Sequence, residues 1–293
     1  MAKDYRLEPK SGRNPNPSGR VSCSTAIPPH IRIATLPRTE TAVTFPIRFA
    51  ICVAAALSAV SFAGAILPDV RSPSHETHAQ SSEPGSIAQA PSNDALRAQL
   101  TALRDSFADA IKSSGFKPSI DPPQIALDNP PSFGRYDSGA NLLHIAAWSE
   151  LGPDGEGRFV RLKAVLNDPR SPEAIFDDSV NHWIFAHELS HWWQACQHKD
   201  DGGHYTVEYG ANRIAAAYWR MEDPAYMQRR TEHFRAIYNL IPNPIPADQS
   251  KEKYFDENYS RLAGSPAYTW FQSAMVVDAS AESPLPTFKQ ALQ

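Results

Sequence analysis

Ile184-Phe185-Ala186-His187-Glu188-Leu189-Ser190-His191-Trp192-Trp193 contains two histidines four residues apart, and every residue around and between His187, Glu188 and His191 is uncharged. Residues i and i+4 of a helix lie on the same face, one turn apart, so both imidazole rings can reach a single point. An uncharged surround is what a buried helix needs, since a stray charge there would lose its hydration without gaining a partner. The stretch therefore predicts a buried helix.

The limits of this helix follow from its flanks. Neither Pro nor Gly occurs between Ser179 and His198. Asp177 or Asp178 is expected to cap its start, and Gly202-Gly203 is expected to end it. The alternative, in which the His and Glu side chains only make surface hydrogen bonds, requires no such burial.

The pattern His187-Glu188-x-x-His191 is HExxH, in which both ring nitrogens bind Zn²⁺ and the glutamate acts on a water molecule at the open position of the metal. A catalytic zinc needs a third protein ligand. The metzincin pattern does not supply one, because Gln194 and Gln197 occupy the positions where it has Gly and His.

Glu208 is the preferred third ligand over the other downstream candidates, which are His198, Asp200, Asp201 and His204. Residues 205–219, rich in Ala and aromatic residues, predict a second helix that can pack antiparallel to the first. Asn212, one turn after Glu208, can accept a hydrogen bond from the far nitrogen of a ligating histidine. The alternatives are an exposed helix glutamate at Glu208 and a surface residue at Asn212.

HExxH, a glutamate on the next helix and an acidic or amide residue four positions later together resemble the gluzincin zinc peptidases, over roughly residues 141–220. The resemblance implies an α+β, zincin-like domain with a small β-sheet, one Zn²⁺ per chain, and peptide hydrolysis with Glu188 as general base. Asn212 departs from the Asp of many gluzincins, and no particular family is assigned. Zinc peptidases usually add an oxyanion donor. The candidates for that donor are His204, Tyr205, Tyr209, Tyr254, Tyr259 and Tyr268.

The rest of the domain, residues 93–293, predicts a mainly helical C-terminal half. Residues 140–148 predict a strand after a turn at 137–139, and in zincins an edge strand before the motif helix often binds extended substrate. His144 on this strand is expected to have no chemical role, and residues 157–167 predict a further strand from their alternation. Helices are expected from 96 to 111, with a cap at Ser92–Asp94, and over 224–240, 254–262 and 266–281, with a loop at 242–249. The face of the last helix that carries Tyr268 is expected to be core.

The N-terminal third predicts a targeting region. Residues 1–48 are disordered-looking and basic, Phe49–Leu67 is an apolar run, and residues 68–92 read as a disordered linker. The apolar run is expected to be a cleaved signal peptide or a transmembrane signal-anchor, because the basic flank is typical of the cytoplasmic side. Both alternatives place the zinc domain outside the cytoplasm, in the periplasm or extracellular space or anchored to the membrane. A start of translation nearer Val43 is a further hypothesis.

The net charge of −4 and the scattered Lys and Arg residues argue against nucleic acid as a partner. Cys196 is the lone cysteine of the folded region, so a disulfide within it is not expected. The expected substrate is a peptide or protein, and the oligomeric state is not indicated. Two alternatives remain: a zincin-fold envelope binding or regulatory protein without peptidase activity, and a zinc-dependent hydrolase of a non-peptide amide.

Overall fold

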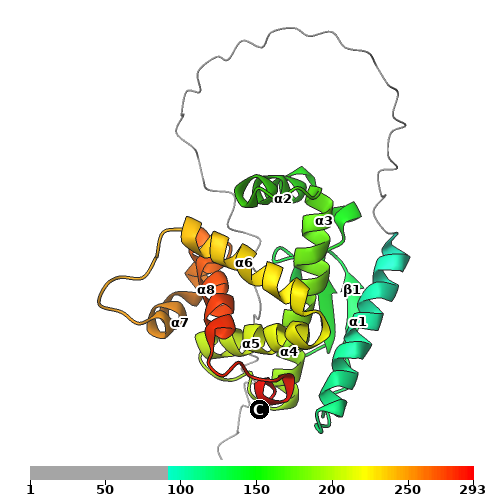
Figure 1. Cartoon of the computed structure of the whole chain (residues 1–293). Helices are drawn as coiled ribbons and strands as arrows, with labels where there is room; N and C mark the ends of the chain where they lie inside the picture. Colours follow the sequence, from blue (N-terminus) through cyan, green and yellow to red (C-terminus); the bar gives the residue numbers. More distant parts are fainter. Residues whose placement is uncertain (1–91) are drawn as a thin grey trace, which may run out of the picture. The chain divides into compact units, whose positions relative to one another are not determined.

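The computed structural model describes residues 92–293 (Figure 1). The expectations for residues 1–91, including the apolar run and the linker, lie outside the described residues. The described part is α+β and mainly helical, with a small three-stranded mixed sheet and a helical C-terminal half, as the sequence predicts. None of its helices is long and apolar enough to cross a membrane.

The sheet follows the first helix, α1 (Asn93–Ser113), which Ser92 caps by accepting a hydrogen bond from Ala95 N. Its strands are β1 (Gln124–Leu127), β2 (Gly134–Asp137) and β3 (Leu142–Ile145), in the order β1-β3-β2. β3 is parallel to β1 and antiparallel to β2. The strand predicted over 140–148 is therefore present, but it is the central strand, and the expectation of an edge strand is wrong at that position. The edge strand nearest to it along the chain is β2.

The strand predicted over residues 157–167 is wrong, because this segment belongs to helix α2 (Pro153–Leu166), which follows a short 3-10 turn, η2 (Trp148–Glu150). Pro153 occupies the first turn, where its missing N–H costs nothing, and Asn167 ends the helix in a left-handed conformation with φ 49°. The apolar residues Phe159, Leu162 and Leu166 also fit helical spacing. The alternation that suggested a strand, with Phe159, Arg161 and Lys163 on one side and Val160, Leu162 and Ala164 on the other, was misleading.

The motif helix is part of a longer rod made of α3 (Pro172–Phe176), the π-helical segment η3 (Asp177–Ile184) and α4 (Phe185–Cys196). The predicted cap at Asp177 or Asp178 is wrong, since Asp177 has helical backbone angles and Ser171 caps the rod instead. The predicted end is also wrong, because α4 is capped by Gln197 rather than by Gly202-Gly203. Every residue of α4 is buried, as the uncharged residues around and between His187, Glu188 and His191 predict.

The C-terminal half consists of α5 (His204–Glu222), α6 (Pro224–Leu240), α7 (Lys251–Leu262), α8 (Pro266–Ala281) and the short α9 (Phe288–Ala291). The bounds of α5 to α8 agree with the predicted helices within a few residues, and the predicted loop at 242–249 separates α6 from α7. The short α9 was not predicted. α5 packs between α4 and α8, and α6 packs on α8 (Figure 1). The antiparallel α4–α5 pair brings the predicted metal ligands of both helices to one place.

Candidate metal centre

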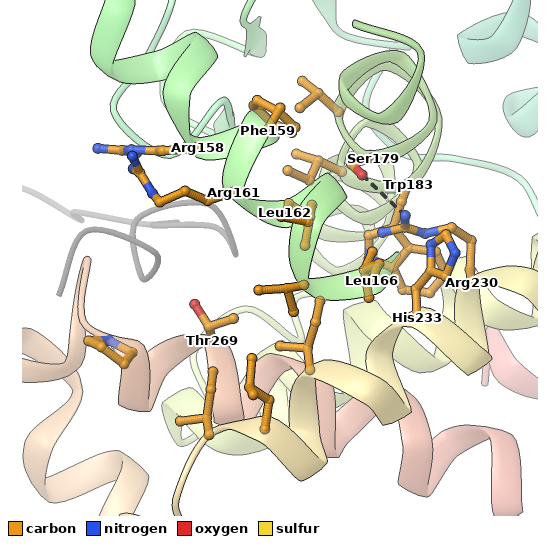
Figure 2. Close-up of a pocket in the computed structure, with 18 of the residues that line it drawn as sticks. Arg158, Phe159, Arg161, Leu162, Leu166, Ser179, Trp183, Arg230, His233 and Thr269 are labelled. Carbon is orange, nitrogen blue, oxygen red and sulfur yellow. Dashed lines mark hydrogen bonds between the residues drawn. The ribbon is translucent and has the colours of Figure 1, made fainter. Parts of the chain in front are cut away.

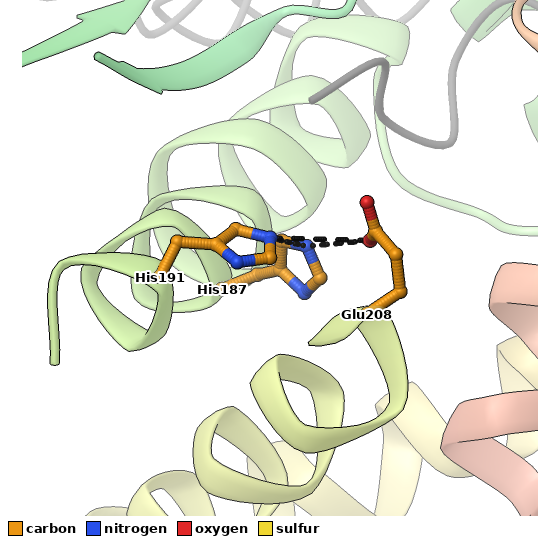
Figure 3. A group of neighbouring side chains, drawn as sticks. All are labelled: His187, His191 and Glu208. Carbon is orange, nitrogen blue, oxygen red and sulfur yellow. Dashed lines mark hydrogen bonds and ion pairs between the residues drawn. The ribbon is translucent and has the colours of Figure 1, made fainter. Parts of the chain in front are cut away.

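The side chains of His187 and His191 from α4 and of Glu208 from α5 converge on one point (Figure 3). The two Nε2 atoms lie 3.1 Å apart, and Glu208 Oε2 lies 3.3 Å from Nε2 of His187 and 3.9 Å from Nε2 of His191. Donor atoms bound to a tetrahedral zinc at about 2.0–2.2 Å lie roughly 3.3–3.6 Å from one another. The three donor atoms are therefore spaced as the ligands of a metal ion are, and the group could hold one.

Burial controls the protonation of this group, because His187, His191 and Glu208 are 2%, 7% and 2% exposed. Burial alone would raise the pKa of Glu208. The hydrogen bond from His187 and the charges of His191 and His187 outweigh this effect and lower the pKa from 4.5 to about 2. Burial also lowers the pKa of His191, and the neighbouring His187 adds to this effect. For His187, burial is outweighed by Glu208, and its pKa is raised. An ionised carboxylate and facing imidazole nitrogens form a donor set that a cation satisfies.

Gln194 fixes the orientation of His191. Its amide nitrogen donates to the carbonyl of Val207 at 2.8 Å, so its Oε1 faces the ring and accepts from His191 Nδ1 at 2.8 Å. The proton of the ring is thereby held on Nδ1, which leaves the lone pair of Nε2 for a metal. Gly210 gives the amide room, since a Cβ there would lie 2.8 Å from Gln194 Nε2. Sequence reasoning used Gln194 only to exclude the metzincins, although its i+3 spacing from His191 is a signal for this contact.

Asn212 lies close to the other ligand histidine. Its amide nitrogen donates to Gln272 Oε1 at 2.7 Å and to the carbonyl of Glu208 at 3.0 Å, which leaves Oδ1 as the remaining acceptor. Asn212 Oδ1 and His187 Nδ1 are both buried and neither completes a hydrogen bond, while the Asn212 side chain is among the groups that raise the pKa of His187. The role of Asn212 as the hydrogen-bond acceptor of His187 stays a prediction.

Three side chains from the C-terminal half hold the carboxylate of Glu208. The hydroxyls of Tyr259 on α7 and Tyr268 on α8 donate to Oε1 at 3.0 and 3.3 Å, and the amide of Gln272 donates to Oε2 at 2.8 Å. Tyr268 is buried, as expected of a core face, yet its hydroxyl belongs to the centre. Sequence reasoning missed Gln272, whose one signal is its position one helical turn after Tyr268.

The other oxyanion candidates lie differently. The ring of His204 stacks on that of Tyr259, with centroids 3.9 Å apart and planes at 5°. The ring of Tyr205 packs against Tyr209 and Phe255, and burial raises the pKa of Tyr205. Tyr254 stacks on Phe271 in the core formed by α7 and α8. Tyr259 and Tyr268 differ from these residues, because their hydroxyls donate to the carboxylate of Glu208.

Glu188 is fully buried, and the edge strand β2 fixes its carboxylate. The backbone N–H of Tyr136 donates to Glu188 Oε2 at 2.8 Å. Tyr136 can do so because the residue pairs that bond β2 to β3 alternate: Ala146 N donates to Phe133 O, so the N–H of Tyr136 points away from β3. Gly134 lets the strand approach the rod, since a Cβ there would lie 2.3 Å from Ile184 Cγ2. His144, on the central strand, pairs instead with Asp128.

No family model matches this chain, and neither a curated protein nor a solved structure matches it. The resemblance to gluzincins therefore has its structural support in the buried group of His187, His191 and Glu208 on two packed helices.

Proposed function

We propose that the chain is a zinc-dependent peptidase of gluzincin type in which His187, His191 and Glu208 bind one Zn²⁺ and Glu188 is the general base. The observation that carries the proposal is the position of Glu188. It directly follows a metal-ligand candidate, its charge raises the pKa of His187, and the backbone N–H of Tyr136 donates to its carboxylate. Activation of a metal-bound water requires a carboxylate that lies beside the metal ligands, is held in a fixed orientation and does not itself bind the metal.

When bound, zinc would lower the pKa of a coordinated water toward neutrality and polarise a substrate carbonyl. Glu188 would accept the proton of the attacking water on its carboxylate and pass it to the departing amine. The hydrogen bond from the N–H of Tyr136 to Oε2 would hold the Glu188 carboxylate in one orientation, so the carboxylate would not need to turn between the two proton transfers. Gln194 and the side chains around Glu208 would keep the three ligands in place.

One observation favours the alternative of a binding protein that keeps the metal site without hydrolysis. The ligand candidates and Glu188 are buried, and Tyr259 and Tyr268 occupy the space over Glu208. A peptidase must open a path to this centre, whereas a protein that only holds a metal needs none. Hydrolysis of a non-peptide amide would use the same residues in the same roles.

The proposal extends to location. The apolar run Phe49–Leu67 with its basic flank supports an enzyme that acts outside the cytoplasm, either released after cleavage or tethered through this segment. Its substrate would then be a peptide or protein of that compartment.

The proposal is tested by assaying the full chain against a fluorogenic peptide library, with zinc content measured on the same samples. Glu188→Gln should keep its zinc and lose hydrolysis by about a thousandfold, the order expected of a general acid–base residue. Glu222→Gln, which removes an exposed carboxylate at the end of α5, is the control and should match wild type. A Glu188→Gln protein that hydrolyses peptides at the wild-type rate would refute the assignment of the base. Wild-type protein that holds zinc but cleaves no peptide would favour the binding protein.

A further inference from the structure

A cavity of about 380 Å³ lies between α2, η3, α6 and the start of α8 (Figure 2). It is separate from the metal centre, because none of His187, Glu188, His191 and Glu208 lines it. Its volume is within the range of about 300–1,000 Å³ that is typical of small-molecule sites, near the lower end.

The walls of the cavity are apolar. They include Phe159 and Leu162 of α2, Trp183 and Ile184 of η3, and Ile237 of α6. The space exists because α2 buries only Phe159 against its neighbours, while Val165 of α2 and Leu240 of α6, which also line the cavity, stay 38% and 51% exposed. A ligand of suitable size would gain packing contacts with these apolar walls.

The charged residues that line the cavity have one sign. They are Arg158, Arg161 and Arg230, and the lining residues that the structure describes include no Asp or Glu. His233 also lines the cavity, but burial lowers its pKa. Figure 2 shows Arg158 and Arg161 together on α2, with Arg230 and His233 on the opposite side. A pocket with apolar walls and cationic groups at its edge fits a ligand that is apolar along its length and anionic at one end.

The two sides differ in how far their charge is already neutralised. Arg230 is 4% exposed and donates from Nη1 to Asp178 and Ser179, at 3.0 and 3.1 Å, while its Nε is buried without a partner. Arg161 is exposed and forms no ion pair with another residue of the described part. The side of α2 is therefore where an anionic head can gain a partner while it keeps part of its hydration.

We propose that this cavity binds a single-chain anionic amphiphile, of which an aliphatic carboxylate is the simplest, with the chain between Leu162 and Trp183 and the carboxylate at Arg161. The small volume favours one chain over a two-chain lipid. The site is independent of the metal, so it would give the protein a ligand whether or not the proposed peptidase activity is present.

The test is calorimetric titration of the full chain with decanoate and with 1-decanol, in the presence and absence of a chelator. Decanoate should bind saturably at one site, more tightly than decanol, and equally with and without the chelator. Val165→Glu puts a carboxylate on the exposed part of the wall and should weaken decanoate binding at least tenfold. Arg161→Gln should weaken it by about two- to fivefold, as for a partly exposed ion pair, and leave decanol unchanged. Arg235→Gln, on the outer face of α6, is the matched control and should change neither.

Four results would overturn the proposal. The first is no saturable binding of decanoate. The second is binding that Val165→Glu leaves unchanged, which would place the ligand elsewhere on the chain. The third is binding that the chelator abolishes, which would make the cavity part of the metal centre. The fourth is equal affinity for decanol, which would make the cavity a non-selective apolar surface. None of these results depends on peptidase activity, so failure here is distinguishable from failure of the proposed function.

Discussion

Two neighbouring parts of the rod α3–η3–α4, the metal end in α4 and the cavity end in η3, solve the problem of burial differently. At the metal end, His187, Glu188 and His191 are buried polar groups, and they have polar partners from α5, β2 and α4 respectively. At the cavity end, Trp183 and Ile184 face an apolar cavity that α2 covers incompletely. Buried polar groups must be matched atom by atom, whereas an apolar surface can tolerate unfilled space at a smaller cost.

The difference is also one of neighbours. α4 is held on one side by α5, which in turn packs on α8, so the metal centre is built from elements far apart in the chain. α2 makes fewer contacts with the rest of the domain and contacts mainly α3, its neighbour in sequence. The metal end is therefore expected to be rigid and intolerant of substitution, and the cavity end to be tolerant.

Loss of a ligand at the metal end should have the largest effect. Glu208→Ala removes one of the three proposed ligands, together with the carboxylate that accepts hydrogen bonds from Tyr259, Tyr268 and Gln272. Zinc affinity should fall by more than about a hundredfold, since even loss of a group that only orients a ligand costs about 10–100-fold. Competition with a chromophoric chelator measures the affinity. An unchanged affinity would mean that His204 or Asp201, and not Glu208, is the third ligand.

Gly134→Ala tests the contact between β2 and the rod. The added Cβ would lie 2.3 Å from Ile184 Cγ2 and 3.3 Å from Glu188 Cγ, so the strand must move away. The free energy of unfolding should fall by about 1–3 kcal/mol, and hydrolysis should fall with zinc content unchanged. Gly139→Ala, in the turn after β2, is the control. Wild-type stability and activity in Gly134→Ala would show that β2 does not position Glu188.

Gln194→Leu tests the orientation of His191 without removal of a ligand. The ring loses its acceptor at Nδ1, and the carbonyl of Val207 loses a donor. Zinc affinity should fall about tenfold, and Gln194→Glu, which restores an acceptor for the ring, should recover part of the loss. If Gln194→Leu binds zinc as wild type does, the hydrogen bond has no part in metal binding.

The smallest effect is expected near the cavity, where ion pairs rather than a metal neutralise the buried charge. The hydrogen bonds of Arg170 lower the pKa of Asp168 to about 2, from an ordinary value of 3.8. Because the folded-state pKa is lowered, the stabilisation is present above about pH 4 and is lost as the pH falls toward 2. Asp168→Asn should lower the free energy of unfolding by about 1 kcal/mol at pH 7, with allowance for the partial exposure of Arg170, and by less at pH 3. A gap that stays the same at both pH values in denaturant titrations would contradict this assignment.

The sequence predicted those parts of the site that depend on local spacing. The i,i+4 pair on α4 and the position of Glu208 near the start of the next helix need only helix periodicity and an antiparallel turn. The order of the strands could not be predicted in this way. β3 lies between β1 and β2 and pairs in parallel with β1, the strand farther from it in sequence. Gln272 and Tyr268 could not be assigned either, since they reach Glu208 from α8 across 60 or more residues of chain.

The errors in α2 and at the start of the rod have local causes. Residues 157–167 fit both an alternating and a helical pattern, and a short segment with few buried residues does not distinguish the two. Asp177 and Asp178 are good capping residues, but Ser171-Pro172 six residues earlier is a complete start signal, and the π-helical segment carries the helix through the two aspartates.

Whether His187, His191 and Glu208 hold a metal is decided by the metal content of the purified full chain, with its unfolding followed before and after chelation. About one zinc per chain is expected. At free zinc a thousandfold above the dissociation constant, chelation should lower the free energy of unfolding by about 4 kcal/mol. A protein that contains no zinc, binds none when it is offered, and unfolds identically with and without chelator would contradict the assignment of His187, His191 and Glu208 as a metal centre.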